Sequence, residues 1–146
     1  MAFSPRTEHT DPIAVVADDD EGVRSVVGAW LEGRGFRVRT VRDGVELVEH
    51  LGELQRTGRL SSPVMVVADI DMPRRNGLAA LEIIHRRFPN VRVVLLTAFA
   101  DALTRARALA LGAAAVLPKP CSWEQLAAFL EKYRGHRRAL HGGRLD

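Results

Sequence analysis

The chain has 146 residues, of which 47% are apolar and 27% charged, proportions that are ordinary for a single globular domain. No apolar run approaches the roughly 20 residues that a membrane-spanning helix needs, and the polar segment Met1–Pro12 lacks the apolar core of a signal peptide. The single cysteine, Cys121, excludes an internal disulfide, and the formal charge of +3 is not gathered into the basic stripe typical of nucleic-acid-binding proteins.

Five apolar runs alternate with amphipathic stretches along the chain, a pattern that indicates repeated strand–helix units around a parallel sheet. Four runs are almost continuous Val, Leu, Ile and Ala, as expected for strands buried on both faces, whereas the second alternates with arginines and is predicted to be an edge strand. The predicted strands are Ile13–Ala17, Phe36–Val41, Val64–Ala68, Val91–Leu96 and Ala113–Leu117.

Helix start and stop signals fall between these runs. Asp43, with Glu46 three residues later, has the spacing of a capping box, and Gly35 is predicted to end a helix in the left-handed conformation. The stretch Arg56–Pro63 contains glycine, serine and proline and is predicted to be a loop. The predicted helices are Glu21–Arg34, Gly44–Gln55, Leu78–Phe88, Ala102–Leu111 and Trp123–Arg134.

The strict alternation of five strands and five helices predicts an α/β fold with a doubly wound parallel sheet. Right-handed crossovers place helices on both faces of such a sheet. We expect the flavodoxin-like strand order 2-1-3-4-5, in which ligands bind at the carboxyl ends of the strands.

Acidic residues follow two of the predicted strands. Asp18 and Asp19 come directly after the first strand, and Asp69 comes after the third. Two like charges 4 Å apart repel by about 4 kcal/mol at an effective dielectric constant near 20, so such a cluster needs a raised pKa or a cation. Mg²⁺ accepts one or two carboxylates and keeps several waters, and it suits this set of ligands. Asp20 and Glu21 continue the acidic run at a helix start, where negative charge is favourable without a further role.

The fourth and fifth strands end on groups that suit a phosphoryl ligand. Lys119 can place an ammonium opposite the acids, Thr97 adds a hydroxyl, and the small Ala98 leaves room beside it. A carboxylate can itself act as a nucleophile and form an acyl phosphate. The strand ends together predict a site for a divalent cation and a phosphoryl group.

These residues resemble the receiver domain of the bacterial two-component response regulators. An Asp-x-x-Met-Pro motif alone would be a weak signal, but four segments agree with the family in order and spacing, and the resemblance extends from about Pro12 to Tyr133. The segments are Val15-Val16-Ala17-Asp18-Asp19-Asp20, Val67-Ala68-Asp69-Ile70-Asp71-Met72-Pro73, Leu95-Leu96-Thr97-Ala98 and Leu117-Pro118-Lys119-Pro120.

The resemblance implies a role for each acid. Asp69 would accept a phosphoryl group from a histidine kinase or a histidine phosphotransfer protein. Mg²⁺ would be held by Asp19, Asp69 and the backbone carbonyl of Asp71, with Asp18 acting mainly through metal-bound water. The Asp71 side chain would also tune the lifetime of the phosphate.

The resemblance also implies a binding and switching role for residues of the last two strands. Thr97, Ala98 and Lys119 would contact the phosphoryl oxygens, Thr97 would move on activation, and Phe99 would tune the phosphate lifetime. One departure concerns the switch itself: three residues before the lysine, the family usually has Tyr or Phe, and this chain has Val116. The aromatic rotamer that accompanies the movement of Thr97 is therefore missing.

We therefore expect a cytoplasmic receiver domain at residues 12–134, with an N-terminal tail at 1–11, a flexible tail at 135–146 and no output domain. It would act through a downstream protein, without membrane or direct nucleic-acid contacts, and would have no enzymatic activity beyond self-phosphorylation and self-dephosphorylation. The alternatives are a receiver-fold binding module that phosphorylation does not switch, which Val116 favours, and the N-terminal fragment of a longer regulator. A haloacid-dehalogenase-like phosphatase, suggested by Asp69-Ile70-Asp71, ranks lower because the acid pair comes first in the chain.

Overall fold

The computed structural model describes residues 11–99 and 101–133, which form a five-stranded sheet and the helices that connect its strands. The strands are β1 (Ile13–Ala17), β2 (Arg37–Val41), β3 (Val64–Asp69), β4 (Arg92–Thr97) and β5 (Ala115–Pro118). The helices are α1 (Glu21–Glu32), α2 (Gly44–Arg56), the 3₁₀ helix η1 (Arg59–Ser61), α3 (Gly77–Arg87), α4 (Ala102–Ala110) and a final helix at residues 123–133. None of the helices described is long and apolar enough to cross a membrane.

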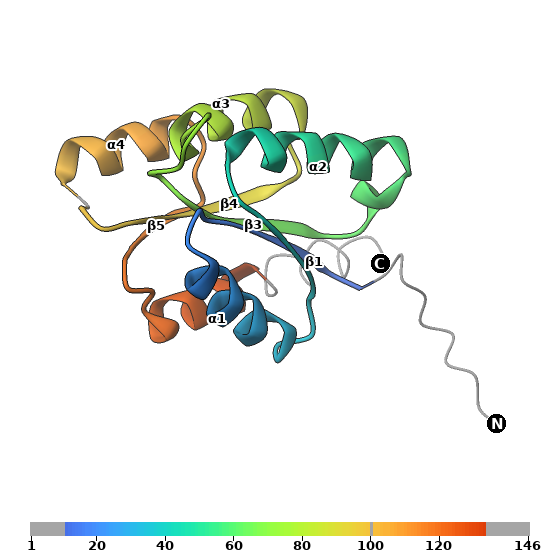
Figure 1. Cartoon of the computed structure of the whole chain (residues 1–146), viewed down its shortest axis with the longest axis horizontal. Coiled ribbons are helices and arrows are strands. Elements are labelled where there is room, and N and C mark those ends of the chain that lie inside the picture. The colour runs from blue at the N-terminus through green and yellow to red at the C-terminus, as the bar shows by residue number, and fades with distance from the viewer. Residues whose placement is uncertain (1–10, 100, 134–146) are drawn as a thin grey trace, which may run out of the picture.

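The sheet is parallel throughout and has the order β2-β1-β3-β4-β5, which confirms the predicted flavodoxin-like topology. Helices α2, α3 and α4 cover one face, and α1 and the final helix cover the other (Figure 1). Strand β2 lies at one edge, as its arginine-rich sequence predicts.

Strands β1, β3 and β4 are buried on both faces because successive side chains enter two different cores. Val15 and Val66 belong to the core under α2 and α3, whereas Val16 and Val67, one residue further on, belong to the core under α1 and the final helix. This explains the continuous apolar runs in the sequence. The second core is closed at its rim by Trp30 of α1, which stacks on Trp123 of the final helix with 5.2 Å between ring centroids.

The helix ends follow the sequence signals with small differences. Asp43 accepts a hydrogen bond from the Glu46 N–H at 2.9 Å, and Gly35 has the predicted left-handed φ of 95°. Helix α1 nevertheless ends at Glu32, two residues earlier than predicted, because the turn that leads to Gly35 already begins there. The predicted loop between α2 and β3 contains the short helix η1.

Strand β5 begins two residues later than predicted. The Ala113 N–H donates to the Ala108 carbonyl and so belongs to the end of α4, and regular pairing with β4 starts at Ala115 opposite Val94. The predicted tails, except for Asp11, and the predicted end of the last helix at Arg134 lie outside the described residues.

Candidate functional site

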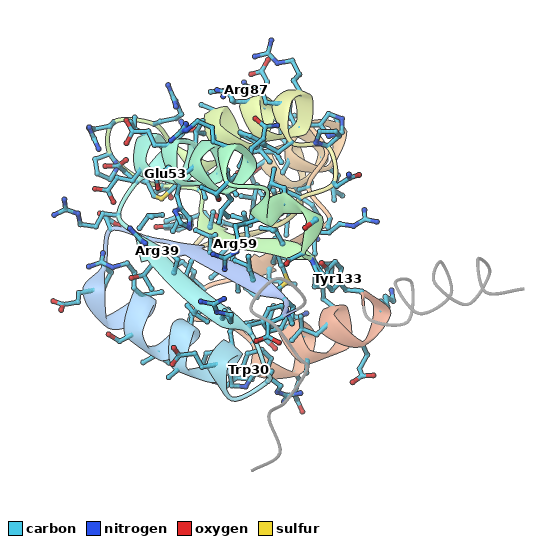
Figure 2. All side chains as sticks on the ribbon, turned by 90° about the vertical axis from the view of Figure 1, so that its right-hand side faces the viewer. Trp30, Arg39, Glu53, Arg59, Arg87 and Tyr133 are labelled. Carbon is cyan, nitrogen blue, oxygen red and sulfur yellow. The ribbon has the colours of Figure 1, made fainter. Side chains whose placement is uncertain are left out.

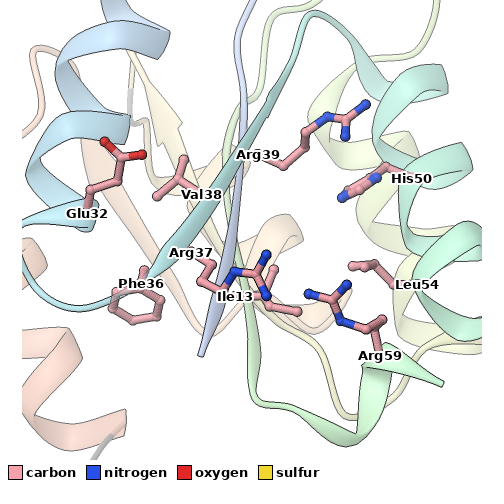
Figure 3. Close-up of a pocket in the computed structure, with 9 residues that line it drawn as sticks. All are labelled: Ile13, Glu32, Phe36, Arg37, Val38, Arg39, His50, Leu54 and Arg59. Atoms are coloured by element: carbon pink, nitrogen blue, oxygen red, sulfur yellow. The ribbon is translucent and has the colours of Figure 1, made fainter. Parts of the chain in front are cut away.

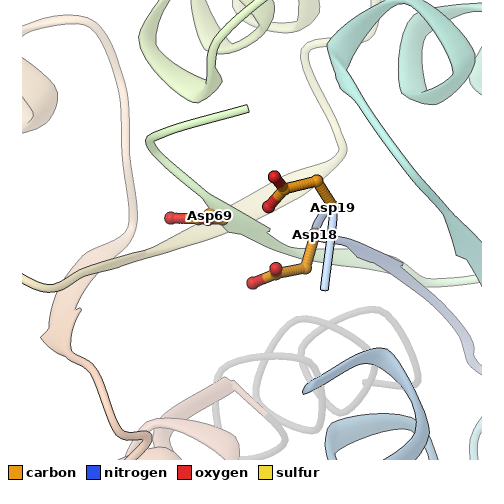
Figure 4. A group of neighbouring side chains, drawn as sticks. All are labelled: Asp18, Asp19 and Asp69. Carbon is orange, nitrogen blue, oxygen red and sulfur yellow. The ribbon is translucent and has the colours of Figure 1, made fainter. Parts of the chain in front are cut away.

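Three acids meet at the carboxyl edge of the sheet (Figure 4). Strands β1 and β3 are neighbours with Ala17 paired to Ala68, so the residues that follow these two positions, Asp18 and Asp69, emerge side by side. Both carboxylates are buried, with exposures of 1% and 5%, whereas Asp19 is exposed. One carboxylate oxygen from each of the three lies within 4.8 Å of the other two, a spacing from which all three could reach a single cation.

Lys119 joins the two buried acids. Its Nζ lies 2.9 Å from Oδ2 of Asp18 and 3.1 Å from Oδ2 of Asp69, although it follows β5, which is two strands away from β3. The Lys119 N–H donates to the Thr97 carbonyl at 2.8 Å, which fixes the lysine against the end of β4. The Lys119–Pro120 peptide bond is cis.

The pKa values in this cluster reflect burial and charge together. Burial raises the pKa of Asp69, and the nearby Asp18 charge adds to this, while the Asp71 N–H and Lys119 oppose it without reversing it. For Lys119, burial lowers the pKa, but the hydrogen bonds and charges of Asp18 and Asp69 outweigh burial and raise the pKa overall. The site therefore holds a firmly protonated ammonium beside a carboxylate whose negative charge is poorly solvated.

Backbone contacts hold the buried acids in place. The Asp20 N–H donates to Oδ1 of Asp18 at 2.9 Å, and the Arg24 guanidinium donates to the Asp18 carbonyl at 2.7 Å. The Asp71 N–H donates in the same way to Oδ1 of Asp69 at 3.1 Å. In each acid one carboxylate oxygen is thus oriented by the following turn, and the other, Oδ2, faces Lys119.

The start of α3 packs directly against Asp69. A Cβ on Gly77 would lie 2.5 Å from the Asp69 carbonyl oxygen and 2.9 Å from the Ile70 Cα, which leaves room for no residue but glycine without a shift. The Gly77 N–H donates to the Ile70 carbonyl at 2.8 Å. This close approach positions the segment that carries Asp69 and Asp71.

Thr97 is buried at the end of β4, but its hydroxyl bonds with its own loop. It donates to the Phe99 carbonyl at 3.2 Å and accepts from the Phe99 N–H at 3.1 Å. Ala98 is exposed and the Phe99 side chain is 80% exposed. The structure thus places the Thr97, Ala98 and Lys119 backbones at one edge of the sheet, with the Thr97 hydroxyl held by Phe99.

Val116 lies in the core rather than in the site. It is 2% exposed and belongs to the apolar cluster under α2 and α3, opposite Leu95 in the β4–β5 ladder. Its small side chain is fully accommodated there.

Sequence reasoning missed the contact between Arg74 and Asp43. The Arg74 side chain is 56% exposed, yet its Nε lies 2.9 Å from Oδ2 of Asp43. Burial raises the pKa of Asp43, but hydrogen bonds from Arg74 and from the Glu46 backbone outweigh this and lower it. The two residues are 31 positions apart, so no local pattern could have indicated the pair.

The same segment contacts the start of α2 through its backbone. The Gly44 N–H donates to the Arg75 carbonyl at 3.0 Å, and a Cβ on Gly44 would clash with that oxygen. The β3–α3 loop, which carries Asp71, is therefore attached to α2 at two neighbouring points.

Fold and site together define a flavodoxin-like α/β protein with a lysine-bridged acidic pocket at the carboxyl edge of its sheet. The sequence model of the response regulator receiver domain matches residues 14–131. The chain belongs to this family of two-component signal transduction proteins, as its motifs predict.

Similar proteins agree with this assignment. The chain is 33% identical over 124 residues to the "DNA-binding transcriptional regulator NtrC" of Escherichia coli K12, an alignment that covers 85% of this chain and 25% of that protein. It is 34% identical to a "Transcriptional regulatory protein CpxR homolog" of Haemophilus influenzae, with 78% of this chain and 46% of that protein covered. The chain thus spans a quarter to about half of the length of these two relatives.

A solved structure supports the fold. A response regulator receiver domain protein from Clostridium thermocellum superimposes with a TM-score of 0.76 at 24% identity, covering 89% of this chain and 98% of that one. At this identity the likeness concerns the fold alone.

Proposed function

We propose that this chain is the phosphoacceptor of a phosphorelay, in which Asp69 receives a phosphoryl group from a histidine kinase or a histidine phosphotransfer protein. The observation that carries the proposal is the Lys119 ammonium bridging Asp18 and Asp69 at the carboxyl edge of the sheet. The receiver unit spans residues 12–134, acts in the cytoplasm, and signals through contacts with a downstream protein rather than with nucleic acid or membrane.

In the transfer step an oxygen of the Asp69 carboxylate attacks the phosphorus atom of a phosphohistidine. The new O–P bond gives an acyl phosphate, and the P–N bond breaks with its electron pair going to the imidazole nitrogen of the donor. Because burial and Asp18 raise the pKa of Asp69, its ionised form is poorly stabilised by the protein and is a better nucleophile than a solvated carboxylate. Oδ1 is held by the Asp71 N–H, so Oδ2, beside Lys119, is the attacking oxygen.

The acid cluster fits a magnesium ion. Asp18, Asp19 and Asp69 bring three carboxylates within reach of one cation, and oxygen ligands of this kind suit Mg²⁺. We propose that Asp19, Asp69 and the Asp71 carbonyl hold the ion and that Asp18 acts through its water shell. When bound, Mg²⁺ supplies positive charge to a centre where two buried acids and a phosphoryl group would otherwise repel one another.

Lys119 and Thr97 bind the transferred group. The ammonium that pairs with Asp69 in this structure is within reach of phosphoryl oxygens on Oδ2 of the same residue. The Thr97 hydroxyl has to leave Phe99 before it can donate to the phosphoryl group, so phosphorylation would reorganise the Thr97–Phe99 turn. The small Ala98 leaves space for the oxygens, and the exposed Asp71 and Phe99 side chains would tune the lifetime of the phosphate.

A second candidate is a receiver-fold binding module that phosphate does not switch. Val116 favours it, since a buried valine has no second position outside the core to which it could turn. Phosphorylation without a change in partner binding would support this candidate. The possibility that the chain is part of a longer regulator is compatible with both candidates.

Labelling with beryllofluoride and Mg²⁺, or with acetyl phosphate, tests the proposal. We expect the wild type to be modified and Asp69→Asn to remain unmodified. Asp71→Asn is the matched control, because it removes a neighbouring carboxylate and should change the lifetime of the label without preventing labelling. Retained labelling in Asp69→Asn would disprove the site, and an unlabelled wild type would favour the binding module.

A further inference from the structure

A polar groove lies at the amino ends of β1 and β2, at the end of the sheet opposite to Asp18, Asp19 and Asp69. It lies where β1, β2 and η1 meet the end of α2 and continues around β2 to Glu32, Phe36 and Val38, and its whole volume is about 500 Å³. Arg37 and Ile13 pair at the amino ends of β2 and β1, whereas Asp18 follows the carboxyl end of β1. The groove and the phosphoacceptor site therefore do not share residues.

Cationic side chains gather on one side of this groove. Arg37 and Arg39 alternate with Val38 along β2 and so project to the same face, where they meet His50 of α2 and Arg59 of η1 (Figure 3). Figure 3 shows the Arg37 and Arg59 guanidinium groups directed toward each other across the groove, while Glu32 lies on the far side of β2. Figure 2, viewed from the right-hand side of Figure 1, shows Arg39 and Arg59 on the same side of the molecule.

The charges of Arg39 and Arg59 are not compensated within the described part of the chain. Neither side chain forms an ion pair with a carboxylate there, and the Nε of Arg59 is buried without a hydrogen-bond partner. Other arginines do find partners: Arg42 pairs with Glu46 at 3.2 Å and Arg74 with Asp43 at 2.9 Å. A buried N–H donor without an acceptor is rare in folded proteins and calls for a ligand or a water molecule.

The pKa of His50 is affected by the same arginine charges. Its Nδ1 is buried without a hydrogen-bond partner among the described residues, and Glu53 Oε1, at 3.5 Å, is at the limit of hydrogen-bonding distance. Burial lowers the pKa of His50, and the charges of Arg39 and Arg59 lower it further against the effect of Glu53. The lowered pKa favours the neutral ring, which can form a hydrogen bond with a ligand without adding a further positive charge.

We propose that this groove binds a small phosphorylated anion, such as an inorganic polyphosphate or the phosphate chain of a nucleotide. Guanidinium groups match the oxygens of phosphate in a bidentate manner, and the uncompensated charges of Arg39 and Arg59 beside one space favour an anionic ligand. The volume is that of a small-molecule site, and Ile13 and Leu54 give it apolar walls. The arginines face a groove and do not form an extended stripe, which favours a small ligand over nucleic acid.

Titration of the full chain with inorganic triphosphate, followed calorimetrically and by amide chemical shifts, tests this inference. We expect saturable binding with shifts centred on β2, η1 and the end of α2. Arg59→Gln and Arg39→Gln should each weaken binding tenfold or more. Arg86→Gln removes one exposed charge from α3 and should weaken binding less than twofold.

The ionisation of His50 gives a second readout. A bound anion cancels the charges of Arg39 and Arg59, so the pKa of His50 should rise in the presence of triphosphate, and this rise should be smaller in Arg39→Gln. Because Arg39 is exposed, Arg39→Gln keeps the test decisive if Arg59→Gln fails to fold. Asp69→Asn should bind triphosphate as the wild type does, which separates this site from the proposed phosphoacceptor.

Several results would overturn the inference. They are the absence of binding at millimolar triphosphate, equal weakening in Arg86→Gln and Arg59→Gln, and shifts spread evenly over the molecule. Tighter binding of a DNA oligonucleotide or an acidic peptide than of triphosphate would replace the small ligand with a macromolecular one. Comparing inorganic triphosphate with ATP distinguishes recognition of phosphate alone from recognition of a nucleotide.

Discussion

Replacing Lys119 by methionine removes the ammonium that joins Asp18 and Asp69 and keeps most of the length of the side chain. Its Nζ lies 2.9 Å and 3.1 Å from the two acids, whose own exposures are 1% and 5%, so the substitution leaves two buried carboxylates facing each other. Removing one partner of a buried ion pair costs about 3–5 kcal/mol. Because the Lys119 side chain keeps 22% of its exposure, we expect the lower end of that range, about 3 kcal/mol, at neutral pH without divalent ions.

Urea denaturation with EDTA and with Mg²⁺ measures this loss and connects it to the proposed metal site. At the proposed metal site, Lys119 and Mg²⁺ would compete for the same acids in the wild type, whereas in Lys119→Met only the metal could neutralise them. We therefore expect Mg²⁺ to raise the free energy of unfolding more in the variant than in the wild type.

The control is Lys132→Met, which removes the only other lysine, an exposed one, and should change neither quantity. Unchanged stability of Lys119→Met in EDTA would refute the argument that the acids repel. Equal effects of Mg²⁺ on the variant and the wild type would show that the metal does not bind at these acids.

Three further predictions concern the surroundings of the site. Asp43→Ala should lower the free energy of unfolding by about 1 kcal/mol through the lost helix cap alone. Hydrogen bonds outweigh burial and lower the pKa of Asp43 in the folded state. The stabilisation is therefore complete above the ordinary aspartate pKa of 3.8 and is lost only as the pH falls below it. Denaturation at neutral and at acidic pH should show a smaller difference between wild type and variant in acid. Gly77→Ala should cost about 1–3 kcal/mol and reduce the labelling of Asp69, because its Cβ would lie 2.5 Å from the Asp69 carbonyl oxygen, whereas Gly52→Ala, whose Cβ meets only one side-chain atom at 3.7 Å, should do neither. Val116→Tyr should cost about 1–3 kcal/mol in urea denaturation by overfilling the core and leave the labelling intact; unchanged stability would reveal unused space there.

The topology and the acidic cluster could be predicted because both follow from short stretches of sequence. The apolar runs of β1, β3 and β4 are continuous because these strands are buried on both faces, and each of the three leads directly to a polar residue at its carboxyl end. Once the strands are parallel, Asp18 and Asp69 must emerge at the same edge, and only the neighbouring positions of β1 and β3 remain to be learned from the structure.

The parts that could not be predicted depend on contacts between distant segments or on the choice between two hydrogen bonds. Arg74 and Asp43 meet only because the β3–α3 loop folds back on α2. The Thr97 hydroxyl could bond toward the acids or toward its own loop, and it bonds to Phe99. The arginines of β2 correctly predict the solvent-exposed face of an edge strand. No sequence pattern indicates that Arg59, in a predicted loop, lines a groove together with them.

The residues that would receive the phosphoryl group differ from those that would pass the resulting change to the protein surface. Asp69, Lys119 and the neighbouring acids are held by backbone hydrogen bonds and by the close packing of Gly77, so the phosphoryl group would arrive at a prearranged centre. The Thr97 turn is the part of the site that must change its hydrogen bonds for the hydroxyl to reach a phosphoryl group, and below it Val116 fills the core without a second position to occupy. Phosphorylation of Asp69 would therefore change the surface of the protein at the Thr97–Phe99 turn. There the Thr97 hydroxyl bonds to the backbone of Phe99, whose side chain is exposed. Because the Phe99 side chain is already 80% exposed, a change in the Phe99 backbone would alter the protein surface, where a partner could sense it without a rearrangement of the core.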